Sequence, residues 1–184
     1  MGFDRIIHNL PTSENPRMSV SVGTITIMHR VAEFERNRES ILHAYSQIGI
    51  LELRLRSKVP MALVERSPNQ EFWFENLKLN EKGVEDLNRA RQQKPNSPED
   101  MLSLSFWRYL LSNRHYGDLW LPHLHKVFPK VDSPKSHGTF KAIDQAMNSS
   151  LRLRNKIAHY NLDELKSIEY SVKKTEWLIQ VMDE

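Results

Sequence analysis

The sequence predicts an all-α fold, a helical bundle preceded by a short irregular or β-like N-terminal arm. Apolar residues recur at three-, four- and seven-residue spacings over long stretches, which places them on one face of a helix. Glycine is scarce, with 6 residues in 184, and charged helix formers are plentiful. Hydrophobic residues make up 39% of the chain, enough for one core. We therefore expect one helical domain over residues 31–184 and a separate arm over residues 1–30.

The arm differs in pattern from the rest of the chain. Pro11 and Pro16 lie in a polar stretch, and two alternating segments follow on either side of Gly23. Residues 19–22 read Ser-Val-Ser-Val and residues 24–27 read Thr-Ile-Thr-Ile. Alternation rich in β-branched residues is typical of a short strand or one arm of a hairpin. The same segment could instead pack on the bundle or on a second chain.

Helical patterns cover most of the remaining chain. The first helix is expected over residues 32–58, with Pro60 closing it because proline cannot continue a helix. Ser97 followed by Pro98 suits the start of a helix that carries Phe106 and Trp107. Asn161 suits the N-cap of the last helix, which continues to Met182. The other three helices are expected over residues 81–92, 120–127 and 139–158.

Composition limits the classes of protein that the chain can belong to. The absence of cysteine excludes disulfides and zinc–thiolate sites, so a cytoplasmic location is the default expectation. The chain has no run of 18 or more apolar residues, so no transmembrane helix is predicted and no membrane association is expected. The formal net charge of +3 permits an anionic partner such as RNA without requiring one.

A metal site is not expected. His123 and His125 are two residues apart, which is the wrong spacing for one helix face. No carboxylate cluster accompanies them or His115, so the sequence predicts neither a metal ion nor another cofactor.

The residues best suited to chemistry stand at the end of the helix expected over residues 139–158. Asn155 and His159 are four apart and share a helix face. Arg154 is about 140° round the helix from His159, but its long side chain can turn towards a common anion. A histidine can move a proton as general acid or base, and an arginine can stabilise the charge of a phosphate under attack. The trio thus suits metal-independent RNA cleavage, although spacing alone fits an ordinary solvated helix end equally well.

The surrounding residues strengthen this interpretation. Residues 151–161 read Leu-Arg-Leu-Arg-Asn-Lys-Ile-Ala-His-Tyr-Asn and resemble the LRNxxAHxN signature of the Abi-like family, the AbiD/AbiF type of phage abortive-infection proteins. Upstream, residues 51–56 (Leu-Glu-Leu-Arg-Leu-Arg) are similar to the family's LExxLRN helix end. Residues 104–107, 117–120 and 127–129 resemble its FGFW…LW…FP series in the same order. The resemblance covers residues 34–161.

The resemblance implies a HEPN-type helical bundle whose members pair as homodimers. In HEPN ribonucleases two copies of an Arg-x4–6-His motif meet across the dimer interface and form one composite RNA-cleaving cleft. By motif, Arg154 and His159 would be catalytic and Asn155 their polar helper, in an antiviral, abortive-infection or toxin role. An inhibitory RNA or protein partner is also implied. Many relatives have a second histidine where this chain has Tyr160.

Further residues are candidate RNA contacts. Lys156 lies inside the motif and Tyr160 beside it. Arg54 and Arg56 could reach the cleft as phosphate contacts, although most charges on such a helix form a solvated face. Three aromatic side chains could stack on bases, but at helical spacing they are expected in the core. They are Phe106, Trp107 and Trp120.

Two other functions compete with the enzyme. One is a non-catalytic HEPN module that binds RNA or a protein partner through Arg154 and His159. The other is a purely structural dimer or assembly protein, which has no need for the Arg-Asn…His trio.

Overall fold

The computed structural model describes residues 22–67, 72–159 and 165–183. Within these ranges it contains seven α-helices and no strand, so the all-α class is confirmed. The helices are α1 Val22–Arg36, α2 Arg38–Leu63, α3 Glu81–Gln93, α4 Leu104–Leu110, α5 Leu121–Val127, α6 His137–Ala158 and α7 Leu165–Met182. No helix in the described ranges has the length and apolar character needed to cross a membrane.

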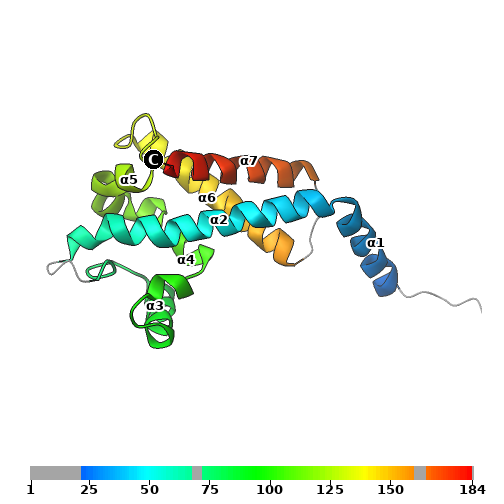
Figure 1. Ribbon diagram of the computed structural model, residues 1–184, viewed down its shortest axis with the longest axis horizontal. Helices are drawn as coiled ribbons and strands as arrows, with labels where there is room; N and C mark the ends of the chain where they lie inside the picture. The colour runs from blue at the N-terminus through cyan, green and yellow to red at the C-terminus, as the bar shows by residue number, and fades with distance from the viewer. Residues whose placement is uncertain (1–21, 68–71, 160–164, 184) are drawn as a thin grey trace, which may run out of the picture.

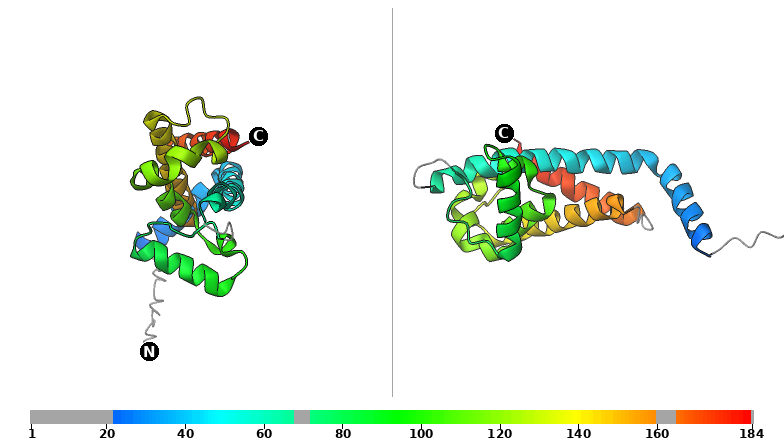
Figure 2. Two further views of the ribbon diagram at one scale, coloured as in Figure 1. Left: turned by 90° about the vertical axis from the view of Figure 1, so that its left-hand side faces the viewer. Right: turned by 90° about the horizontal axis from the view of Figure 1, so that it is seen from below.

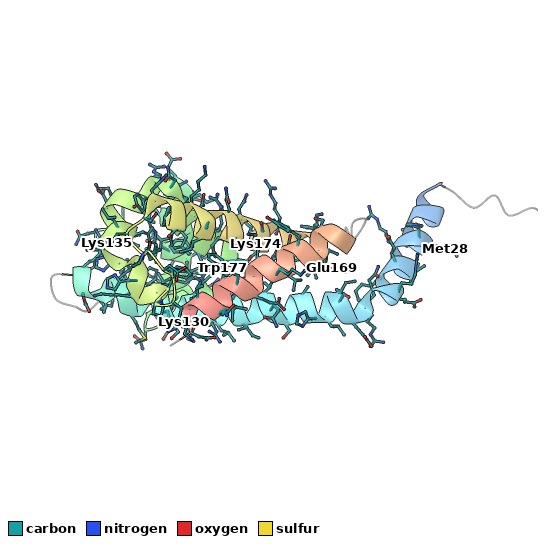
Figure 3. The ribbon with its side chains drawn as sticks, turned by 90° about the horizontal axis from the view of Figure 1, so that it is seen from above. Met28, Lys130, Lys135, Glu169, Lys174 and Trp177 are labelled. Carbon is teal, nitrogen blue, oxygen red and sulfur yellow. The ribbon has the colours of Figure 1, made fainter. Side chains whose placement is uncertain are left out.

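Three long helices form the body of the molecule. α2 and α7 run in the same direction and α6 runs the opposite way, so the molecule is elongated (Figure 1). The most extensive packing joins α6 to α7, and α2 lies against both. α3 lies to one side of these helices (Figure 2). α1 projects from one end, and Met28 on it lies far from Lys130 and Lys135 at the other end (Figure 3).

The core follows the apolar spacing of the long helices. The buried residues of α2 recur mostly every three or four positions. They are Ile41, Ala44, Ile48, Leu51, Leu55, Val59, Ala62 and Leu63. α6 buries Phe140, Ile143, Met147 and Leu153. One buried polar pair lies among them, where the hydroxyls of Ser150 on α6 and Thr175 on α7 are 2.8 Å apart.

Aromatic side chains pack together at one end of the bundle. Trp73, Phe106 and Trp107 are in ring contact, and all three are at most 6% exposed. Trp120 is fully buried, and its Nε1 donates to the carbonyl of Leu110 at 2.6 Å. The prediction that Phe106, Trp107 and Trp120 belong to the core is therefore confirmed. We call this region, residues Trp73, Phe106, Trp107 and Trp120, the aromatic end.

Two corrections concern the first long helix. Pro60 does not close it, because α2 continues to Leu63 and buries Ala62 and Leu63 in its last turn. A proline so near a helix end disturbs few backbone hydrogen bonds, and burial of the following side chains offsets that loss. At its start, the helix expected from residue 32 is broken. Asn37 separates α1 from α2, and its side-chain amide donates to the carbonyl of Glu33 at 3.0 Å.

The arm and the segment after Ser97 also differ from expectation. Residues 22–30 belong to α1, so the alternation at residues 24–27 is helical rather than β-like. Residues 1–21 lie outside the described residues. After Ser97 the chain forms a short 3₁₀ turn, Pro98–Met101, and α4 begins only at Leu104. Leu102, between the two, is buried and has an extended backbone with φ −81° and ψ 134°.

Candidate functional site

The candidate site forms where α6 ends. His159 is the C-cap residue, with non-helical backbone angles, and its N–H donates to the carbonyl of Asn155 at 3.1 Å. The prediction that this helix ends at Ala158 or His159 is confirmed. Leu153 is buried and Ile157 is half-buried, so they hold the inner face of the last turns against the bundle. The polar residues of the same turns are left to face solvent.

Arg154, Asn155 and His159 are all exposed. Arg154 Nη1 donates to Asn155 Oδ1 at 3.4 Å, a long contact between neighbours. Within the described ranges, no hydrogen bond or ion pair ties Arg154 to another helix. These side chains are therefore available to a ligand. We call this region, Arg154, Asn155 and His159, the His159 end.

A groove of about 650 Å³ adjoins the His159 end. It forms because the chain bends at Asn37, so that α1 leaves the bundle near the end of α6 (Figure 1). Its apolar wall consists of Ile27, Val31, Phe34 and Leu42, and its polar wall of Arg30, Glu35, Arg38 and His159. The groove thus combines an apolar surface with cations beside the histidine.

Arg30 and Arg38 were not identified from the sequence. They lie more than a hundred positions before His159, and they approach it only because α1 and α2 meet at an angle. The single sequence signal was Asn37, a residue that interrupts helices through side-chain hydrogen bonds to the backbone.

The structure does not bring Arg54 to the His159 end. Arg54 Nη1 donates to the carbonyl of Ile179 at 3.0 Å and forms an ion pair with Asp183. Both partners lie at the C-terminal end of α7, about 20 Å of helix from the end that begins near His159. Its guanidinium anchors one helix to another.

Arg56 is likewise occupied inside the fold. Its Nη2 donates to the carbonyl of Leu102 at 3.2 Å and lies 3.6 Å from Glu52. Glu52 in turn accepts a hydrogen bond from the N–H of Leu104 at 3.2 Å. Glu52 and Arg56 therefore hold the connection that leads into α4.

Lys156 and Tyr160 complete the predicted set. Lys156 is half-buried, and its Nζ donates to Ser167 Oγ on α7 at 2.9 Å. It stands at the His159 end but already takes part in the α6–α7 contact. Tyr160 lies outside the described residues.

No group of three or more His, Cys, Asp or Glu side chains is placed to hold a metal ion in the ranges that the structure describes. No protein-family model matches the chain, and neither a curated protein nor a solved structure matches it significantly.

Proposed function

We propose that this protein is a metal-independent HEPN-type endoribonuclease of the Abi-like kind, acting in phage defence by abortive infection or as a toxin. The observation that carries the proposal is the exposure of Arg154, Asn155 and His159 together at the end of α6. Two other arginines of the long helices, Arg54 and Arg56, hold the fold. Arg154 has no such role, which is what a residue kept for a ligand requires.

The proposed reaction needs no group beyond the protein and the RNA. The 2′-oxygen of a ribose forms a bond to the adjacent phosphorus while the bond to the 5′-oxygen breaks. His159 removes the 2′-hydroxyl proton or donates a proton to the leaving 5′-oxygen. Arg154 binds the non-bridging oxygens and stabilises their extra charge. The products are a 2′,3′-cyclic phosphate and a 5′-hydroxyl.

Two copies of the chain would complete the site. In one chain His159 lines the groove, whereas Arg154 stands outside its lining. The groove's apolar wall is largely open to solvent, with Ile27 65%, Val31 53% and Leu42 54% exposed. Such a contiguous apolar surface is typical of an interaction site. A second copy seated there brings a second Arg154 and His159 to the same place.

Arg30 and Arg38 fit the same proposal as phosphate contacts. They line the groove together with His159, and arginine suits phosphate because its guanidinium donates two parallel hydrogen bonds. They would bind the RNA backbone on either side of the scissile phosphate.

A second function is favoured by the same apolar wall. A non-catalytic HEPN module would use Ile27, Val31 and Leu42 to hold a protein partner, with Arg154 and His159 as polar contacts. Binding without cleavage distinguishes this module from the enzyme.

The test is RNA cleavage by the purified full chain in EDTA. We expect cyclic-phosphate ends from the wild type. The His159→Ala variant should lose about 100-fold to 10,000-fold in rate, and Arg154→Ala about 100-fold or more. Arg152→Ala and His125→Ala serve as matched controls, because both side chains are exposed and lie outside the proposed site.

The shared cleft has its own test. Leu42→Asp should break the dimer in sedimentation and abolish cleavage, whereas Met61→Asp, an exposed apolar residue near the other end of α2, should do neither. Wild-type protein that binds RNA but yields no cyclic-phosphate ends would contradict the enzyme and favour the binding module. Full activity in a strictly monomeric protein would contradict the shared cleft.

A further inference from the structure

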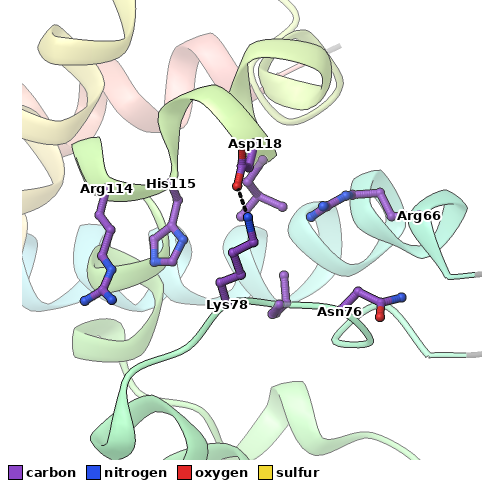
Figure 4. A pocket seen from close by; sticks show the side chains of 8 residues that line it. Arg66, Asn76, Lys78, Arg114, His115 and Asp118 are labelled. Atoms are coloured by element: carbon purple, nitrogen blue, oxygen red, sulfur yellow. Dashed lines mark hydrogen bonds and ion pairs between the residues drawn. The ribbon is translucent and has the colours of Figure 1, made fainter.

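A second polar cavity lies far from the His159 end and takes no part in the proposed cleavage. It has a volume of about 360 Å³ and lies beyond the end of α2, between the segment before α3 and the turn that precedes α5 (Figure 4). Arg66, Lys78, Arg114, His115 and Asp118 line it together with Asn76.

The charge of this cavity is positive. Three cationic side chains and one carboxylate line it, which leaves two positive charges unbalanced. Lys78 Nζ donates to Asp118 Oδ2 at 2.5 Å, and these side chains are 83% and 65% exposed. Lys78, by hydrogen bond and charge, lowers the pKa of Asp118, and Arg66 adds to the effect. An exposed ion pair of this kind contributes little to stability, so a stronger anion can displace Asp118 from Lys78.

His115 provides an independent indication of a ligand. The residue is only 6% exposed, and its buried Nε2 has no hydrogen-bond partner among the described residues. Burial, and next the positive charge of Arg114, lower the pKa of His115, so the ring is neutral at pH 7 and carries one N–H. A buried nitrogen without a partner is costly, so a turn of the ring that offers its N–H to a ligand oxygen in the cavity would be favoured.

The wall of the cavity is more than a charged surface. Asn76 has a positive φ of 61°, a left-handed conformation that asparagine adopts more readily than most residues. Asn76 lies across the cavity from the turn that carries Asp118 (Figure 4). Leu77 and Leu119 add apolar surface. The volume is within the range of small-molecule sites.

We propose that this cavity binds a terminal phosphate monoester carried on a nucleoside. A monoester has close to two negative charges at pH 7 and matches the unbalanced charge of the cavity, whereas a phosphodiester has one. Arg66 and Arg114 bind the phosphate oxygens, Lys78 turns to them from Asp118, and the His115 ring donates its N–H. Asn76 and the two leucines contact the nucleoside. The same chemistry occurs in a free mononucleotide and at the phosphorylated end of a nucleic acid.

Calorimetric titration of the full chain at low salt tests the proposal. The probes are adenosine 5′-monophosphate, adenosine and inorganic phosphate. We expect the monophosphate to bind more tightly than either of its parts. Arg66→Ala and Arg114→Ala should each weaken binding about tenfold, the loss of one charge-assisted hydrogen bond. Lys82→Ala is the control, because it also removes one positive charge, from a side chain that pairs with Asp86 and does not line the cavity.

The Asp118→Asn variant distinguishes a loss of binding caused by misfolding from one caused by the loss of a ligand contact. It removes the competing carboxylate and should tighten binding, which a damaged fold cannot do. No binding of the monophosphate or of a phosphorylated end, equal binding of monophosphate and adenosine, or unchanged affinity in both arginine variants would overturn the proposal.

A deoxyhexanucleotide distinguishes a free mononucleotide from the phosphorylated end of a nucleic acid as the ligand. The proposed nuclease cannot cut this probe, because the probe has no 2′-hydroxyl. Tighter binding of the 5′-phosphorylated than of the 5′-hydroxyl form supports a nucleic-acid end, and monophosphate binding alone supports a free nucleotide. Equal binding of both oligonucleotide forms together with no binding of the monophosphate contradicts a monoester site. The proposal does not rest on the ribonuclease, and His159→Ala should leave this binding unchanged.

Discussion

The aromatic end and the His159 end lie at different ends of the same helical body and present opposite surfaces. At the aromatic end, Trp107 and Trp120 are fully buried, and Arg56 donates into the fold. At the His159 end, Arg154 and His159 face solvent beside an open apolar groove. The side chains of the aromatic end pack inside the fold, whereas those of the His159 end remain exposed. The contrast teaches that arginines on similar amphipathic helices serve stability or a ligand according to what packs against them.

The largest expected difference between the two ends lies in stability. Trp120→Ala removes a fully buried side chain and its hydrogen bond to Leu110, and should lower the free energy of unfolding by about 3–5 kcal/mol. Ile27→Ala, at the exposed groove wall, should change it by less than about 0.5 kcal/mol. Urea unfolding followed by circular dichroism measures both. A large loss at Ile27 would show that the groove is part of the core.

Arg56 and Arg154 allow a second comparison of stability between the two ends. Arg56→Met keeps the apolar stem but deprives the buried Leu102 carbonyl of its donor and Glu52 of its cation. It should cost about 1–3 kcal/mol in the same measurement. The matched change Arg154→Met should cost less than about 0.5 kcal/mol. Equal losses would mean that Arg154 also holds the fold.

A smaller effect is expected midway between the ends. Ser150→Ala removes the hydroxyl that lies 2.8 Å from Thr175, but Thr175 keeps its bond to the Ser171 carbonyl at 2.9 Å. The free energy of unfolding should therefore fall by only about 0.5–1.5 kcal/mol. Ser149→Ala, a half-buried neighbour on α6, is the control and should be nearly neutral.

The smallest effect is a pH dependence near the aromatic end. The pKa of His115 is held below its ordinary value of 6.5, chiefly by burial. The unfolded chain therefore binds this proton at higher pH than the folded protein, and stability falls as the pH drops below about 6.5. His115→Phe should reduce the fall in urea midpoint between pH 7.5 and pH 5.5. An unchanged fall in this variant would assign the dependence to other groups, His123 included.

Much of the helical framework could be predicted because it follows from local rules. The helix expected over residues 81–92 is α3, Glu81–Gln93, and Asn80 caps it by accepting from the N–H of Gly83. The end of α6 at Ala158 was also predicted. Two helix boundaries were predicted wrongly. α2 continues past Pro60 to the buried Leu63, and an extended, buried Leu102 separates the turn after Ser97 from α4. Tertiary contacts can override local preference in this way.

The sequence by itself determined the all-α class, the core aromatics and the position of Arg154, Asn155 and His159 at one helix end. Periodicity and helix-end chemistry act over a few residues, so they can be read from the chain alone. Only the tertiary structure decided that Arg54 and Arg56 are occupied, that Arg30 and Arg38 line one groove with His159, and that His115 lines a cationic cavity. These relations depend on the angles at which helices meet, and those angles are set by side chains distant in sequence.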